Sequence, residues 1–125
     1  SELRRLKPHG AVLAWVSAIP DSDLMISAVT VGEIQAGIEV TRDQDPVRAE
    51  SLTRWLDQVV ASFAVLPMDA EAFRAWARLK HRKSDTLIED AMIAATAQVH
   101  RLTVATRNVR DFEALGVSVL NPFEV

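Results

Sequence analysis

The fold is decided by the stretch LIEDAMIAATAQVHRLTVATRNVRDFEALGVSV, residues 87–119. Apolar side chains recur at helical spacing over residues 87–100, which predicts an amphipathic helix. It is followed by a short apolar strand over 102–105, a helix over 109–115 that ends at a glycine, and a last strand over 117–119. Because a helix connects the two strands, we expect them to be parallel.

The residues before this stretch show the same alternation of helices and short apolar strands. Helices are expected over residues 10–19, from Thr30 onward, after Asp45-Pro46, and after Asp69. Thr30 stands three residues before Glu33, which is the spacing of a capping box at a helix N-terminus. Strands are expected over residues 24–26 and 64–66. Such alternation is typical of a parallel sheet, so the predicted fold class is α/β.

The composition fits one globular domain. The chain has 125 residues, of which 49% are hydrophobic and 25% are charged, and its formal net charge is −3. It contains no cysteine, which excludes a disulfide scaffold, a thiolate metal site and a cysteine nucleophile, and which fits a reducing cytoplasm. Lys and Arg do not outnumber Asp and Glu, so a nucleic acid would have to be held by a local patch or by metal ions.

Four polar residues are expected at one edge of the predicted sheet. Glu33 follows the first predicted strand, and Asp90 lies in the first turn of a helix. Asn108 and Asp111 follow the strand over 102–105, at the start of the next helix. Sites in parallel sheets lie beyond the carboxyl ends of the strands, where helix N-termini also point. We therefore expect three carboxylates and one amide to meet there.

This set of side chains favours a hard cation such as Mg²⁺ or Mn²⁺, because these ions prefer oxygen ligands. Such an ion can activate a water molecule and stabilise the charge on a phosphodiester during hydrolysis. The alternative interpretation is structural, since acids in the first turn of a helix are stabilised by its dipole. A receiver-like phosphotransfer domain would need an acidic pair after its first strand and a lysine near a late strand, and the chain has neither.

Four segments, in order along the chain, match motifs of one family. Residues 27–38, SAVTVGEIQAGI, resemble the motif SAxTxGElxxGi, and residues 89–97, EDAMIAATA, resemble DxxIAATA. Residues 103–112, TVATRNVRDF, resemble TvaTRNxxDF, and the end of the chain over 116–123 resembles Gvxvx-NPf. These motifs are those of PIN-domain ribonucleases, specifically of VapC-type toxins of toxin–antitoxin systems and their FitB-like branch. The resemblance covers essentially the whole chain.

The resemblance implies a PIN-like three-layer fold, in which a central parallel sheet is flanked by helices. It also implies a Mg²⁺- or Mn²⁺-dependent endoribonuclease of a toxin–antitoxin, or plasmid stability, module. Glu33 and Asp90 match metal-site acids of the family. A further acidic position falls within 108–111, so that Asp111 or, as a neutral ligand, Asn108 would complete the set, and Thr106 would orient ligands or a water.

The same resemblance implies the reaction and the partners. Glu33, Asp90 and Asp111 would serve hydrolysis of RNA phosphodiester bonds by a metal-activated water. Arg107, Arg110 and the basic segment 80–83 are candidates for contacts with the RNA backbone. The expected partners are an RNA substrate, a cognate antitoxin protein and a second copy of the chain.

The start of the chain departs from the family. Members begin with a strand and an acid of the form xxLDTNVISEL, whereas Ser1-Glu2-Leu3 matches only the tail of that segment. We therefore expect the first strand and its leading aspartate to be absent, so that residues 1–125 form one N-terminally truncated PIN domain. A shortened start, a strand supplied by a partner or by swapping, and an inactive remnant all stay open. The alternative function is a catalytically impaired PIN-fold binding module that keeps antitoxin binding and dimerisation.

Overall fold

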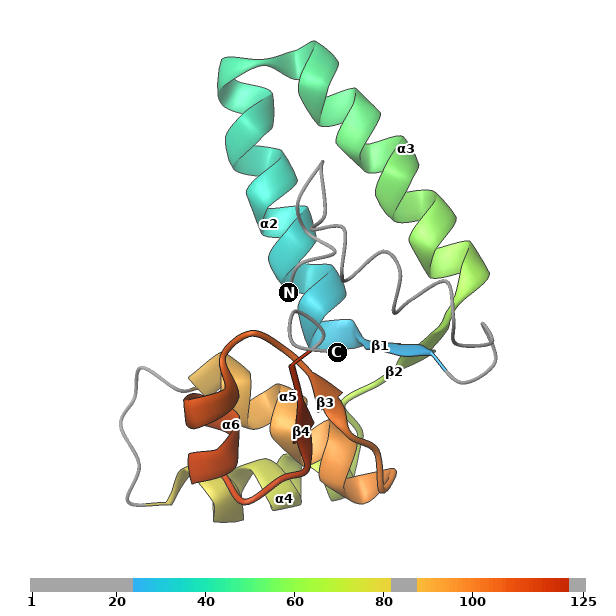
Figure 1. Ribbon diagram of the computed structural model, residues 1–125. Helices are drawn as coiled ribbons and strands as arrows, with labels where there is room; N and C mark the ends of the chain where they lie inside the picture. Colours follow the sequence, from blue (N-terminus) through green and yellow to red (C-terminus); the bar gives the residue numbers. More distant parts are fainter. Residues whose placement is uncertain (1–23, 82–87, 122–125) are drawn as a thin grey trace. The chain divides into compact units, whose positions relative to one another are not determined.

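The computed structural model describes residues 24–81 and 88–121. These residues fall into two compact units, the hairpin unit (residues 24–66) and the C-terminal unit (residues 67–81 and 88–121). The helix expected over 10–19 and the expectations about the start of the chain lie outside the described residues. Figure 1 shows the elements of both units.

The hairpin unit is built from two long helices that are flanked by two short parallel strands (Figure 1). Its elements are β1 (Met25–Ser27), α2 (Ala28–Gln44), α3 (Pro46–Ser62) and β2 (Ala64–Leu66). β1 pairs with β2 in parallel, with Met25 opposite Ala64 and Ser27 opposite Leu66. The predicted strands at 24–26 and 64–66 are therefore confirmed to within a residue. Their parallel direction follows from the helical connection between them.

The two helices pack through aliphatic side chains. Ile34 and Ile38 of α2 are buried against Ala49 and Leu56 of α3. Ala49 is fully buried, and its small side chain lets the two helix backbones approach each other. Each buried isoleucine or leucine contributes about 1.5–3 kcal/mol relative to an exposed one, so this contact accounts for much of the stability of the hairpin.

The spacing in the sequence indicates the correct N-cap for α3 but not for α2. Asp45 accepts a hydrogen bond from the Arg48 N–H at 3.1 Å, which confirms the predicted start of α3. The prediction that Thr30 caps the preceding helix is wrong, because α2 begins at Ala28 and Ser27 accepts from the Val29 N–H at 3.1 Å. Thr30 is instead buried within the helix. Ser27 caps because it is the last residue of β1, where the backbone is still extended.

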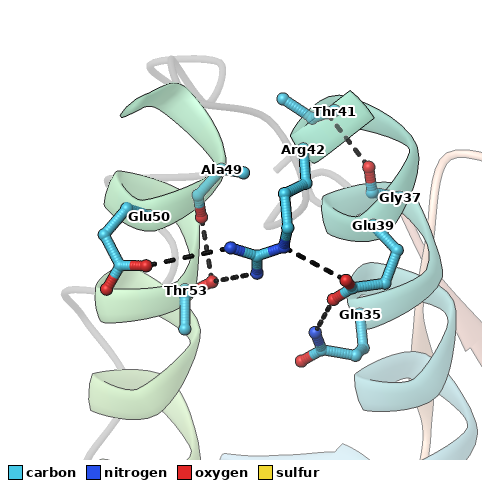
Figure 2. A network of polar contacts seen from close by, with 8 residues as sticks. All are labelled: Gln35, Gly37, Glu39, Thr41, Arg42, Ala49, Glu50 and Thr53. Atoms are coloured by element: carbon cyan, nitrogen blue, oxygen red, sulfur yellow. Dashed lines mark hydrogen bonds and ion pairs between the residues drawn. The ribbon is translucent and has the colours of Figure 1, made fainter. Parts of the chain in front are cut away.

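A network of polar side chains joins α2 and α3 near the turn between them (Figure 2). Arg42 Nε donates to Glu39 Oε1 at 3.2 Å, and Arg42 Nη2 donates to Thr53 Oγ1 at 3.5 Å. Arg42 also forms an ion pair with Glu50 at 3.9 Å, and Gln35 donates to the second oxygen of Glu39. The hydrogen bond from Arg42, and then that from Gln35, hold the pKa of Glu39 below its ordinary value.

The C-terminal unit places three helices around a second pair of parallel strands (Figure 1). Its elements are α4 (Ala70–Lys80), α5 (Ile88–Val99), β3 (Val104–Ala105), α6 (Val109–Ala114) and β4 (Val119–Leu120). Asp69 caps α4, as predicted, by accepting from the Ala72 N–H at 2.9 Å. β3 pairs in parallel with β4, which confirms the predicted direction of the last two strands. Gly116 ends the α6 segment with φ +77°, a conformation that favours glycine.

The core of this unit is formed largely by the alanines of α5. Ala91, Ala94 and Ala97 pack in one cluster with Val104 and with two residues of the α6 segment, Phe112 and Leu115. Ile88 lies within the apolar pattern that predicts this helix, but it is not part of the buried face, because its exposed fraction is 39%. Small residues let neighbouring elements come close to the helix, so the alanine side of α5 faces the core. Among the described residues, no helix is long and apolar enough to cross a membrane.

Candidate functional site

Asp90 lies in the first turn of α5. Its side chain is half-buried, whereas that of the preceding Glu89 is exposed. The next residue, Ala91, is fully buried in the core cluster and fixes the orientation of this turn. The helix N-terminus carries partial positive charge from its free N–H groups, so it favours a carboxylate there.

The segment between β3 and α6 forms a hydrogen-bonded turn. Thr106 Oγ1 accepts from the Asn108 N–H at 3.1 Å, and the Arg107 carbonyl accepts from the Val109 N–H at 2.9 Å. The Thr106 N–H donates to the Leu120 carbonyl at 3.0 Å and so extends the β3–β4 ladder. Asn108 is the N-cap residue of α6, but its side chain makes no capping hydrogen bond. Its amide is exposed at the end of the strand pair.

Asp111 lies in the first turn of α6, three residues after Asn108. Its side chain is exposed, and the following Phe112 is buried with an exposed fraction of 3%. Phe112 and Ala91 belong to the same core cluster. The residues that follow the two aspartates, Asp90 and Asp111, are therefore packed in one core.

Glu33 lies in α2, in the hairpin unit, six residues after the end of β1. Its side chain is half-buried, and the following Ile34 belongs to the buried contact with α3. Each of the three predicted acids thus precedes a buried residue that holds its helix in place. As predicted, Glu33 lies in the helix that follows β1, and Asp111 lies in the helix that follows β3.

The three predicted acids are distributed over the two units of the described residues. Within residues 24–81 and 88–121, no three His, Asp or Glu side chains form a group that could hold a metal ion. Glu33 belongs to the hairpin unit, whereas Asp90 and Asp111 belong to the C-terminal unit. The convergence of the three carboxylates stays a prediction.

The predicted RNA-contacting arginines flank the turn after β3. Arg107 lies within this turn and Arg110 in the first turn of α6, and both side chains are exposed. The basic segment 80–83 is described only at its first two residues. Of these, Lys80 ends α4 and His81 is exposed.

Sequence reasoning missed one contact beside Asp90. The Trp76 indole N–H of α4 donates to the carbonyl of Ile88, the first residue of α5, at 3.3 Å. Helical spacing alone places Trp76 on the apolar side of its helix and gives no sign of this bond. The two residues are separated by a polar connection, and no local spacing in the sequence predicts a bond across it.

The sequence profile of the PIN domain matches residues 3–117. The plasmid stability protein StbB of Pseudomonas syringae pv. tomato is 40% identical, over 99% of this chain and 93% of that protein. The VapC ribonuclease Y4jK of Sinorhizobium fredii is 38% identical, over 99% of this chain and 92% of that protein. The toxin FitB of Neisseria gonorrhoeae is 33% identical, over 98% of this chain and 92% of that protein.

A solved structure agrees with these sequence comparisons. The crystal structure of FitAcB from Neisseria gonorrhoeae matches this chain with a TM-score of 0.87 and 32% identity, over 100% of this chain and 94% of that one. The chain therefore belongs to the PIN-domain family. Within this family it is similar to VapC-type and FitB-like members. The predicted α/β PIN fold is confirmed.

Proposed function

We propose that the chain is the toxin of a toxin–antitoxin, or plasmid stability, module and that it acts as a metal-dependent endoribonuclease. The observation that carries the proposal is the 38% identity to a VapC ribonuclease over 99% of this chain. The similarities to a toxin and to a plasmid stability protein support the same function. The proposed reaction is hydrolysis of a phosphodiester bond in RNA. A water oxygen forms a bond to phosphorus, one ester P–O bond of the RNA breaks, and the released ribose oxygen takes up a proton.

Glu33, Asp90 and Asp111 would hold a Mg²⁺ or Mn²⁺ ion, with Asn108 as a neutral ligand. All four side chains offer carboxylate or amide oxygens, the ligand type that these cations prefer. The Asn108 side chain makes no capping hydrogen bond, which is compatible with a role as ligand. When bound, the ion would activate a water and neutralise charge that develops on the phosphodiester.

The residues around these ligands would position them and the substrate. The Thr106 hydroxyl fixes the backbone of Asn108 through its hydrogen bond to the Asn108 N–H. Arg107 and Arg110 would contact RNA phosphates, since both are exposed next to this turn and guanidinium groups bind phosphate oxygens in pairs. Such contacts would place the RNA without reading its sequence.

The proposed partners are an RNA substrate, a cognate antitoxin protein and a second copy of this chain in a homodimer. The similarity to the toxin FitB and to the FitAcB structure supports an antitoxin as a partner of this chain. The profile match over 3–117 supports one PIN domain over residues 1–125. The proposed compartment is the cytoplasm, where a toxin of this class meets RNA.

The test compares the variants Asp90→Asn and Glu89→Gln. Both remove one negative charge from the same helical turn, but only Asp90 is a proposed ligand. We expect Asp90→Asn to abolish Mn²⁺ binding and RNA cleavage, and Glu89→Gln to leave both near the wild-type level. Calorimetric titration with Mn²⁺ and cleavage of a labelled RNA measure the two effects, and circular dichroism checks that both variants fold.

Unchanged Mn²⁺ affinity in Asp90→Asn would remove Asp90 from the site. A wild-type chain that binds an antitoxin but neither binds Mn²⁺ nor cleaves RNA would contradict the nuclease and support the impaired binding module.

A further inference from the structure

Trp76 joins α4 to the start of α5. Besides the hydrogen bond from its indole N–H to the Ile88 carbonyl, it makes two contacts through its ring. Phe73 packs edge-on against it, with ring centroids 6.0 Å apart and planes at 89°. The Lys80 ammonium lies 4.7 Å from the ring centroid, a distance typical of a cation–π contact. Trp76 is therefore held in one orientation by neighbours on its own helix.

The hydrogen bond of Trp76 reaches the turn that carries Asp90. Ile88 and Asp90 both lie in the first turn of α5, about 3 Å apart along the axis at the helical rise of 1.5 Å per residue. Ala91, the next residue, is fully buried in the core cluster against which Trp76 also packs. A displacement of the Ile88 carbonyl would therefore displace the backbone of Asp90.

A second contact fastens the opposite end of the same helix pair. The buried Thr96 hydroxyl lies 2.9 Å from the Met92 carbonyl and 3.0 Å from Met68 Sδ. Met68 directly precedes Asp69, the N-cap residue of α4. Thr96 lies about 9 Å along α5 from Asp90 at the same helical rise. α4 and α5 are thus joined at both ends, and of these two contacts it is the one from Trp76 that adjoins the first turn of α5.

We propose that Trp76 is a positioning residue for Asp90, which acts by holding the first turn of α5 through the Ile88 carbonyl. The inference rests on the proposed function, because it takes Asp90 as a metal ligand. Removing a partner that orients a metal ligand typically lowers metal affinity 10–100-fold. Because Trp76 acts through the backbone, we expect the lower end of this range, about 10-fold.

The test measures Mn²⁺ affinity in Trp76→Phe and in the matched control Thr96→Val. The first variant keeps an aromatic ring and removes the N–H donor, and the second removes the hydroxyl at the other end of the helix pair. We expect Mn²⁺ to bind about 10-fold more weakly to Trp76→Phe and with wild-type affinity to Thr96→Val. Thermal unfolding monitors the fold, so that a general loss of stability is separated from a loss of affinity.

Should Trp76→Phe fail to fold, benzothienylalanine at position 76 replaces only the N–H by sulfur and gives the same comparison. Equal weakening in the Trp76 and Thr96 variants would overturn the proposal, because any loosening of the helix pair would then suffice. Unchanged affinity at Trp76 beside a loss in Asp90→Asn would overturn the role of Trp76 alone. Unchanged affinity in both would overturn the proposed metal site as well.

Discussion

A single hydroxyl links the β3–β4 ladder to the turn that carries the candidate ligands. Thr106 donates through its N–H to Leu120 and accepts through its side chain from the Asn108 N–H. The second bond sets the backbone from which Asn108 projects and leads directly into the first turn of α6, where Asp111 lies. Local hydrogen bonds of this kind, from a threonine to a backbone N–H two residues on, are typical of turns.

Replacing Thr106 by valine removes this bond and keeps the shape of the side chain. We expect the free energy of unfolding to fall by about 1 kcal/mol, the net contribution of one hydrogen bond. Thr106→Ser retains the hydroxyl and should keep most of this stability. Urea denaturation of the three proteins measures the difference, and equal stability of Thr106→Val and wild type would show that the hydroxyl does not hold the turn.

Residue types at helix starts predicted some caps and missed one. Asp45 and Asp69 each directly precede a segment in which apolar residues recur at helical spacing. As expected, Asp45 caps α3 and Asp69 caps α4. Ser27 and Thr30 are both good capping residues, and the choice between them depends on where β1 ends. That end is set by pairing with β2, a contact distant in sequence, and so it could not be predicted from the local spacing.

The polar network between α2 and α3 makes the stability of the hairpin depend on pH. The pKa of Glu39 is lowered by hydrogen bonds, first from Arg42 and then from Gln35. A carboxylate with a lowered pKa in the folded state stabilises that state above its unfolded pKa, about 4.3 for glutamate. This stabilisation is lost as the pH falls through the lower pKa of the folded state.

We therefore expect Glu39→Gln to be slightly less stable than the wild type at pH 7. This difference in stability should shrink as the pH falls well below the ordinary pKa of glutamate, which is about 4.3. The effect is small, because the network is exposed to solvent. Chemical denaturation at a series of pH values measures it, with Asp57→Asn as a control that removes an exposed acid of α3 outside the network. A difference that persists unchanged in acid would contradict the role of the Glu39 charge.

The helices themselves were predictable, but the buried face of α5 was not. Apolar periodicity places a helix over 87–100, and the structure has it at Ile88–Val99. Larger apolar residues as well as alanines occur in this helix, so the pattern leaves open which of them meet the core. The elements packed against α5 decide it: they approach the alanines, which leaves Ile88 exposed.

At the scale of the whole chain, the sequence predicts the parallel direction of the strands and the class of fold. It does so because a helix between two strands forces a crossover connection. The strands of residues 24–66 pair with each other, as do those of the C-terminal unit. Helical and strand patterns are local, whereas bringing Glu33 to Asp90 and Asp111 requires contacts between residues far apart in sequence. The rule that sites lie beyond the carboxyl ends of parallel strands, together with the family motifs, carries that part of the prediction.

The most direct test of the account is nuclear magnetic resonance of the isotope-labelled chain during addition of Mn²⁺, whose unpaired electrons broaden the signals of nearby amides. If the three carboxylates bind one ion, a small amount of Mn²⁺ broadens the amide signals of Glu33, Asp90 and Asp111 together, and excess Mg²⁺ restores all three. The exposed acids Asp57 and Glu71 serve as controls and should keep sharp signals. Broadening at one of the three alone, or equally at the controls, would contradict a shared ion.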